Sequence, residues 1–103
     1  MIQAKFDTEN ILRIIDGIRD PIRIEIVFLV GRNKAMNVGE ITECFKISRP
    51  AISHHLKILK DTGILRSERV GQEIYYRLDR KHLVNSLRNL ADAVDNCNCN
   101  PEE

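Results

Sequence analysis

The sequence predicts a mainly α-helical domain that carries a single β-hairpin, and three observations support this fold class. Apolar residues recur at helical spacing through most of residues 8–60. Between residues 64 and 78 the spacing changes to that of two short strands on either side of Gly71-Gln72. Helical spacing then returns over residues 79–95. Because 103 residues is the length of one domain, these elements are expected to share one core.

The first predicted helix (8–19) is apolar over more of its surface than one buried stripe requires. Ile11 and Ile15 contribute to this excess, which indicates that part of the helix packs on a second subunit. A second helix begins at Asp20-Pro21, since an aspartate cap followed by proline is a strong start signal. The next residues alternate as in a strand at first, but the start signal and the length of the run favour a helix.

Residues 37–60 are predicted to form a helix-turn-helix unit. Asn37 begins its first helix with a capping box, because Glu40 follows three residues later. Ser48 caps its second helix. The buried stripe of this second helix consists of Ile52, Leu56 and Leu59. Its opposite side is polar and basic, as in a helix that contacts phosphates and base edges of DNA.

The hairpin predicted at residues 64–78 follows that helix directly, as the wing does in a winged helix-turn-helix domain. Leu65, Ile74 and Tyr76 are expected to face the core. The arginines of the hairpin are then left for solvent or phosphate.

Charge is segregated along the chain although the net charge is only +1. Residues 46–81 hold nine Lys and Arg against four Asp and Glu, whereas the remainder holds seven basic and eleven acidic residues. A basic segment of this kind indicates contact with nucleic acid phosphates, although a solvated surface can produce it too. No apolar run approaches the roughly 20 residues of a membrane span. The odd number of cysteines, three, favours a reduced, cytoplasmic location.

The last predicted helix (79–95) has a narrow apolar seam of the coiled-coil type. With the first helix it predicts a homodimer, whose interface would include Ile11, Ile15, Leu83, Leu87, Leu90 and Val94. The alternative is that this helix packs only on its own domain. Residues 96–103, which carry two of the cysteines, are expected to form a mobile tail.

Three segments together resemble the ArsR/SmtB family of bacterial winged-helix repressors. They are Ser-Arg-Pro-Ala-Ile-Ser-His-His-Leu-Lys-Ile-Leu from residue 48, Thr-Gly-Ile-Leu from residue 62, and Gly-Gln-Glu-Ile-Tyr-Tyr-Arg-Leu from residue 71. The Asp-Pro-Ile-Arg segment from residue 20 is similar to the family's second-helix opening. The resemblance covers residues 8–95 and implies a dimeric repressor that binds a palindromic double-stranded operator and leaves it when an inducer binds.

The family pattern implies that the second helix of the helix-turn-helix lies in the major groove and that the wing lies along the backbone or the minor groove. His55 lies at the edge of the buried stripe and is expected to pack in the core. The predicted DNA-binding residues are Ser48, Arg49, Ser53, His54, Lys57, Arg66, Arg69 and Gln72.

The family's known metal sites are altered in this sequence. Where relatives carry Cys-x-Cys and an acid in the third helix, this chain has Asn-Val-Gly-Glu from residue 37. In the last helix Asp79 matches a ligand, but Lys81 replaces the next one. The remaining candidate is the pair Cys97 and Cys99, which suits a soft ion such as As(III), Cd(II) or Pb(II), or a persulfide or oxidant. A third ligand could come from Cys44, which is itself expected to be buried, or from the partner chain.

Three alternatives to a thiol-sensing repressor are a regulator with a non-metal trigger, a winged-helix module that binds only protein, and an enzyme. Fold alone does not exclude the protein-binding module, but the basic segment argues against it. The sequence has no Gly-rich phosphate loop and no nucleophile–base pair, so an enzyme is not expected.

Overall fold

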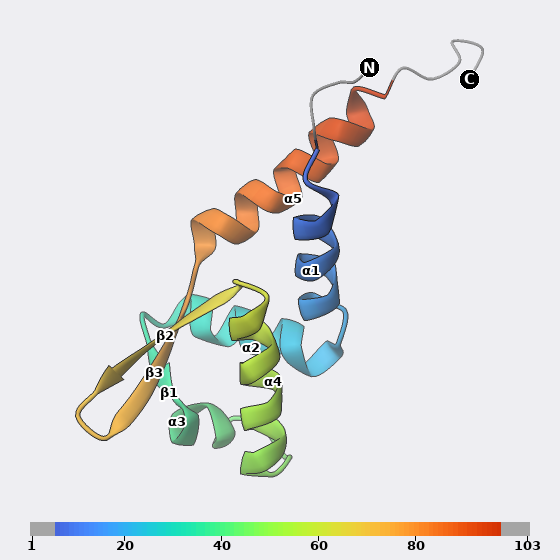
Figure 1. Cartoon of the computed structure of the whole chain (residues 1–103). Coiled ribbons are helices and arrows are strands. Elements are labelled where there is room, and N and C mark those ends of the chain that lie inside the picture. The colour runs from blue at the N-terminus through green and yellow to red at the C-terminus, as the bar shows by residue number, and fades with distance from the viewer. Residues whose placement is uncertain (1–5, 98–103) are drawn as a thin grey trace.

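The computed structural model describes residues 6–97 and confirms a mainly helical domain with a β-hairpin (Figure 1). The helices are α1 (Thr8–Ile18), α2 (Pro21–Arg32), α3 (Val38–Thr42), α4 (Arg49–Asp61) and α5 (Arg80–Asp95). The strands are β1 (Met36–Asn37), β2 (Leu65–Val70) and β3 (Glu73–Leu78). Within residues 6–97, every helix falls short of the length and apolarity that crossing a membrane demands.

Each helix begins at a polar side chain that accepts a hydrogen bond from a first-turn amide, which satisfies an otherwise unpaired N–H. The capping residues are Asp7, Asp20, Asn37, Ser48 and Asp79. The capping box predicted for α3 is present, with Asn37 and Glu40 bonding each other's backbone amides at 2.8 and 3.0 Å. The segment after Asp20-Pro21 is helical, so the start signal outweighs its partial strand-like alternation.

The hairpin is part of a three-stranded antiparallel sheet with the order β1-β3-β2. Val70 pairs with Glu73 across the turn, and Gly71 has φ +64°, a conformation that side chains with a Cβ rarely adopt. Strand β1, which pairs Met36 with Tyr76, gives no recognisable signal in the sequence. Two residues are too few to display the alternation by which a strand is recognised.

The core lies where α1, α2, α3 and α4 meet the sheet. All three residues of the stripe predicted on α4 are fully buried, which turns the opposite face of that helix outward. The largest fully buried side chains are Ile14, Ile26, Val30, Ile41, Ile52, Leu56, Leu59, Ile64 and Leu65.

Two expectations about burial were wrong. Ile74 is 37% exposed, because it pairs with Arg69 near the turn of the hairpin and the packed helices do not extend that far. Cys44 is exposed because α3 ends at Thr42, so the residue no longer continues the apolar face of the helix. Its thiol lies 3.6 Å from the carbonyl oxygen of Glu40.

Helix α5 extends away from the body of the domain, with α1 beside it (Figure 1). Asn10 on α1 joins the two helices by donating a hydrogen bond from Nδ2 to Ser86 Oγ on α5, at 2.9 Å. We call this pair of helices the α1/α5 arm. The end of α5 lies away from α3 and the turn of the hairpin, whereas the buried side of α1 packs into the core beside α4.

Candidate nucleic-acid interface

The outward face of α4 carries the polar side chains that the sequence predicted to contact DNA. Ser53, His54 and Lys57 are exposed. Arg49, the first residue of the helix, is also exposed. Ser48 Oγ accepts a hydrogen bond from the Ala51 amide at 3.2 Å, so this hydroxyl is committed to capping the helix. Lys57 Nζ lies 3.0 Å from an Asp61 carboxylate in an exposed pair of the kind that contributes little stability and separates readily.

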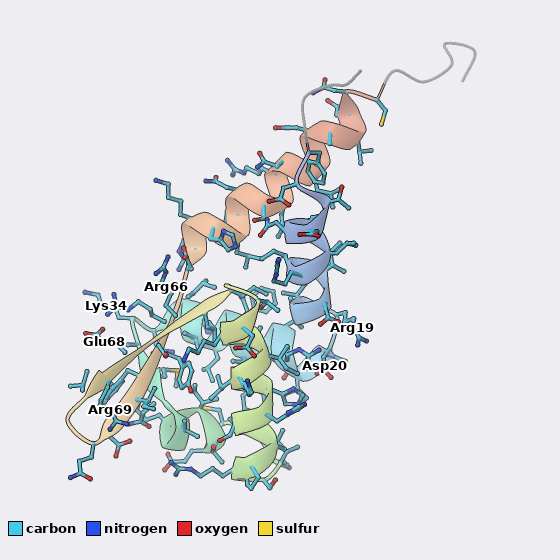
Figure 2. The ribbon with its side chains drawn as sticks, in the orientation of Figure 1. Arg19, Asp20, Lys34, Arg66, Glu68 and Arg69 are labelled. Carbon is cyan, nitrogen blue, oxygen red and sulfur yellow. The ribbon has the colours of Figure 1, made fainter. Side chains whose placement is uncertain are left out.

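The two predicted arginine contacts of the hairpin have different surroundings. Arg66 lies at the α5 end of β2, whereas Arg69 lies nearer the turn (Figure 2). Arg66 Nε donates to Asp79 Oδ2 at 2.8 Å, and this hydrogen bond holds the pKa of the Asp79 carboxyl below its usual value despite partial burial. Arg69 and Gln72 are exposed, and no ion pair engages Arg69 within residues 6–97. Arg69 is therefore the more available of the two arginines.

Arg23 on α2 is a functional candidate that the sequence analysis did not single out. It is only 6% exposed. Its guanidinium donates to the carbonyl oxygens of Gly17 at 2.7 Å and Asp16 at 3.2 Å, both at the C-terminal end of α1. It also lies 3.2 Å from His55 Nδ1 on α4. The residue belongs to the Asp-Pro-Ile-Arg segment noted above, but a charged side chain gives no sequence signal that it will be buried.

His55 does not belong to the outward face of α4. It is half-buried and turned toward α2, where its Nδ1 meets Arg23. Because a guanidinium can only donate, His55 Nδ1 is the acceptor of any hydrogen bond at this contact. The expectation that His55 packs inward is thus partly met, through a polar rather than an apolar contact.

The residues predicted for a dimer interface divide into two groups. Ile11 and Leu83 are buried in the core of the subunit, which leaves them little surface for contact with a second subunit. Ile15, Leu87 and Val94 are exposed, and Leu90 is half-buried against the core. Leu12 is a further exposed apolar residue on α1. The α1/α5 arm therefore has an apolar surface that its own chain does not cover.

Cys44 and Cys97, the two cysteines within residues 6–97, do not converge on one site within the subunit. Cys44 follows α3 and Cys97 follows α5, and these two helix ends lie at opposite ends of the molecule (Figure 1). Cys97 is exposed, and Cys99 lies outside the described residues. Within residues 6–97, no group of three or more His, Cys, Asp and Glu side chains is arranged to hold a metal ion.

Comparison with known proteins gives consistent matches. Residues 20–67 match the family described as "Bacterial regulatory protein, arsR family". The transcriptional repressor SdpR of Bacillus subtilis is 44% identical over 71 residues, which cover 69% of this chain and 78% of SdpR. The arsenic resistance transcriptional regulator ArsR1 of Pseudomonas putida is 41% identical over 59 residues, which cover 57% of this chain and 46% of that regulator.

A solved structure has the same fold. It is an ArsR-like transcriptional regulator from Rhodococcus sp. RHA1, with a TM-score of 0.77 and 28% sequence identity, and the match covers 84% of this chain and 81% of the other. A capped, polar-faced helix followed by a β-hairpin defines a winged helix-turn-helix domain, and these relatives are transcriptional regulators. The chain belongs to the ArsR family, also called ArsR/SmtB. This family consists of DNA-binding transcriptional regulators, so the protein is a regulator rather than an enzyme.

Proposed function

We propose that the protein is a homodimeric repressor that binds a palindromic operator with its two α4 helices and releases it when an inducer binds. The observation that supports this most is the outward face of α4. Its polar side chains are exposed while the opposite side of the same helix is fully buried. The core therefore fixes which side of α4 faces outward, and we assign that side to a DNA groove.

We assign the base contacts to the middle of α4 and the phosphate contacts to the periphery. Ser53 and His54 project from a rigid helix and carry hydrogen-bonding groups that suit base edges. Arg49 and Lys57 flank them and suit phosphates, as do the wing residues Arg69 and Gln72. Arg66 contributes less in this assignment, because it is paired with Asp79.

The apolar surface of the α1/α5 arm supports the proposed dimer. Burying Leu12, Ile15, Leu87 and Val94 against a second copy would remove from water a surface that one chain leaves exposed. A two-fold axis through the arm would place the two α4 helices on one side of a duplex. Operator half-sites about one helical turn, or roughly 34–36 Å, apart are then expected.

Substitutions in the two groups of DNA contacts should have different effects, measured by fluorescence anisotropy on the chain's own promoter region. Ser53→Ala and His54→Ala should change the preference among operator variants by about 1–3 kcal/mol at single positions. Arg69→Gln should weaken binding to all sequences. It should also make the slope of log K against log salt concentration less steep, by the amount that about one phosphate contact contributes. Arg19→Gln is the matched control, because Arg19 is exposed and paired with Asp16 at the end of α1 (Figure 2).

Two results would contradict this assignment of contacts. One is an Arg69→Gln protein that binds like the parent at every salt concentration. The other is an Arg19→Gln protein that loses as much affinity for DNA as the Arg69 variant. Removing any positive charge would then weaken binding, whether or not the residue contacts DNA.

We further propose a thiol trigger at Cys97 and Cys99, for which As(III), Cd(II), Pb(II), a persulfide or an oxidant is the inducer. The softness of thiolates toward such species and the naming of ArsR1 as an arsenic resistance regulator support it. Cys44 of the same subunit is too remote to be the third ligand, which would have to come from the partner chain.

The thiol trigger is tested by adding each of those agents to the operator complex of the parent and of a Cys97→Ser/Cys99→Ser protein. We expect at least one agent to release the parent but not the double variant, with Cys44→Ser as the matched control. Equal responses of parent and double variant would rule out the two cysteines as the trigger.

A further inference from the structure

A groove runs between α2, the end of β3 and the start of α5, and its lining includes Leu83 but none of the residues assigned to DNA contacts. Its volume is about 300 Å³. Its walls are mainly apolar and include Val27 and Phe28 of α2, Leu78 of β3 and Val84 of α5. Phe28 is 58% exposed, so a large aromatic side chain lies at the mouth of the groove without a cover from its own chain.

One end of this groove is cationic. A second hollow of about 180 Å³ shares Gly31, Arg32, Leu78 and Arg80 with the first and adds Lys34. No acidic residue lines either hollow. Within residues 6–97, none of the three cations forms an ion pair. The groove thus joins an apolar cleft to a cluster of cations that form no ion pair within residues 6–97.

Arg80 lies where the two hollows meet. Its Nη2 donates to the Gly31 carbonyl oxygen at the end of α2, at 2.9 Å, and this is an exposed hydrogen bond. The remaining N–H groups of a guanidinium are then free to donate to an anion. A Cβ added at Gly31 would approach Leu78 Cδ2 to 3.0 Å, so the backbone of α2 passes close to the wall of the groove.

We propose that this groove binds a small amphipathic anion, an aliphatic or aromatic body that ends in a carboxylate or a similar group. The body lies against Phe28 and Val84, and the anionic group accepts hydrogen bonds from Arg80 and Arg32. The volume is at the lower end of the range for small-molecule sites, which fits a ligand of modest size. Charge complementarity selects against a neutral molecule of the same shape.

The position of the groove gives such a ligand a way to act. Leu78 is the last residue of β3, and Arg80 is the first residue of α5. An anion that draws Arg80 from the Gly31 carbonyl therefore acts at the junction between the hairpin and the α1/α5 arm. Resting on the function proposed above, we assign this ligand the role of an inducer that needs no thiol.

Isothermal titration of the full chain with octanoate, and with 1-octanol as the uncharged analogue, tests the site directly and without DNA. We expect one saturable octanoate site per chain and at least tenfold weaker binding of octanol. Arg80→Gln and Phe28→Ser should each weaken octanoate binding at least tenfold while the circular dichroism spectrum is unchanged. Arg19→Gln and Val70→Ser, on exposed positions away from the groove, should bind octanoate like the parent.

Absence of saturable binding, equal binding of octanol, or full binding by both groove variants would overturn the site. The groove could instead be covered by a second copy of the chain, and light scattering on Phe28→Ser tests this. A monomeric Phe28→Ser protein beside a dimeric parent would show that the groove is a subunit interface and would overturn the ligand site. Operator release by octanoate is measured separately. Octanoate binding by a protein with no affinity for its promoter would refute the proposed function and leave the groove assignment standing.

Discussion

Arg23 shows how a single buried side chain can connect the parts of this domain. Its guanidinium satisfies carbonyl groups at the end of α1 that have no partner within that helix, where a positive charge also complements the helix dipole. The same group holds His55 of α4. The α1/α5 arm and the helix assigned to the DNA groove are therefore linked through one arginine on α2.

Replacing Arg23 should destabilise the fold, because it leaves buried acceptors unpaired. We expect Arg23→Met to lower the free energy of unfolding by about 2–4 kcal/mol. Arg23→Lys should be intermediate, since one ammonium group cannot reproduce the planar set of donors. Urea denaturation measures both, with the exposed Arg13→Met as the control expected to stay within about 0.5 kcal/mol of the parent. An Arg23→Met protein as stable as that control would show that the network is dispensable.

At the scale of single residues, the sequence predicts local backbone conformation better than it predicts burial. Ser48 and Asp20 were identified as caps because capping depends on neighbours along the chain. The burial of Arg23 and the exposure of Cys44 depend on where other helices pack, which no local pattern records. Gly17 of α1 is a similar case, because an added Cβ there would come within 2.6 Å of Ile64 Cδ1 and 2.9 Å of Thr62 Oγ1. Close packing explains this glycine.

At the scale of elements, Asp79 joins the hairpin to α5. One carboxylate oxygen accepts from the His82 amide and caps the helix, at 3.1 Å, while the other accepts from Arg66 of β2. The Asp79 amide donates to the Ile64 carbonyl at 2.9 Å. Helix starts such as this one were predictable, whereas β1 and the early end of α3 were not, because short elements are defined by tertiary pairing rather than by periodicity.

Asp79→Ala should remove both the cap and the ion pair, whereas Asp79→Asn should retain the cap. We expect the alanine variant to lose about 1–2 kcal/mol of stability and the asparagine variant to lose less. Because Arg66 lowers the Asp79 pKa in the folded state, the charged carboxylate stabilises the fold fully above the unfolded pKa of about 3.9. This contribution disappears as pH falls through the lower folded pKa.

Thermal unfolding followed between neutral pH and pH 2 measures this pH dependence. The difference in stability between parent and Asp79→Asn should be constant at neutral pH and shrink below about pH 4. A difference that grew on acidification would contradict a lowered pKa for Asp79.

At the scale of the whole molecule, the chain divides into an arm with exposed apolar residues and a body with the outward face of α4 and the wing (Figure 1). Both parts were predicted from the sequence: the apolar seam of residues 79–95 indicated the arm, and the basic segment of residues 46–81 indicated the DNA-facing body. The seam could not distinguish Leu83, which the subunit buries itself, from Leu87 and Val94, which it leaves exposed. Apolar periodicity marks the buried side of a helix but does not say which chain covers it.

The central proposal, a dimer that binds its operator through α4 and the wing, is tested most directly by titrating the promoter region with the full chain at several salt concentrations. We predict saturation at two chains per site, with a logarithmic salt slope of about −0.9 per phosphate contacted. Leu87→Glu should lower the affinity by disrupting the dimer. No affinity for the promoter at low salt, or full affinity of a monomeric Leu87→Glu protein, would contradict the account.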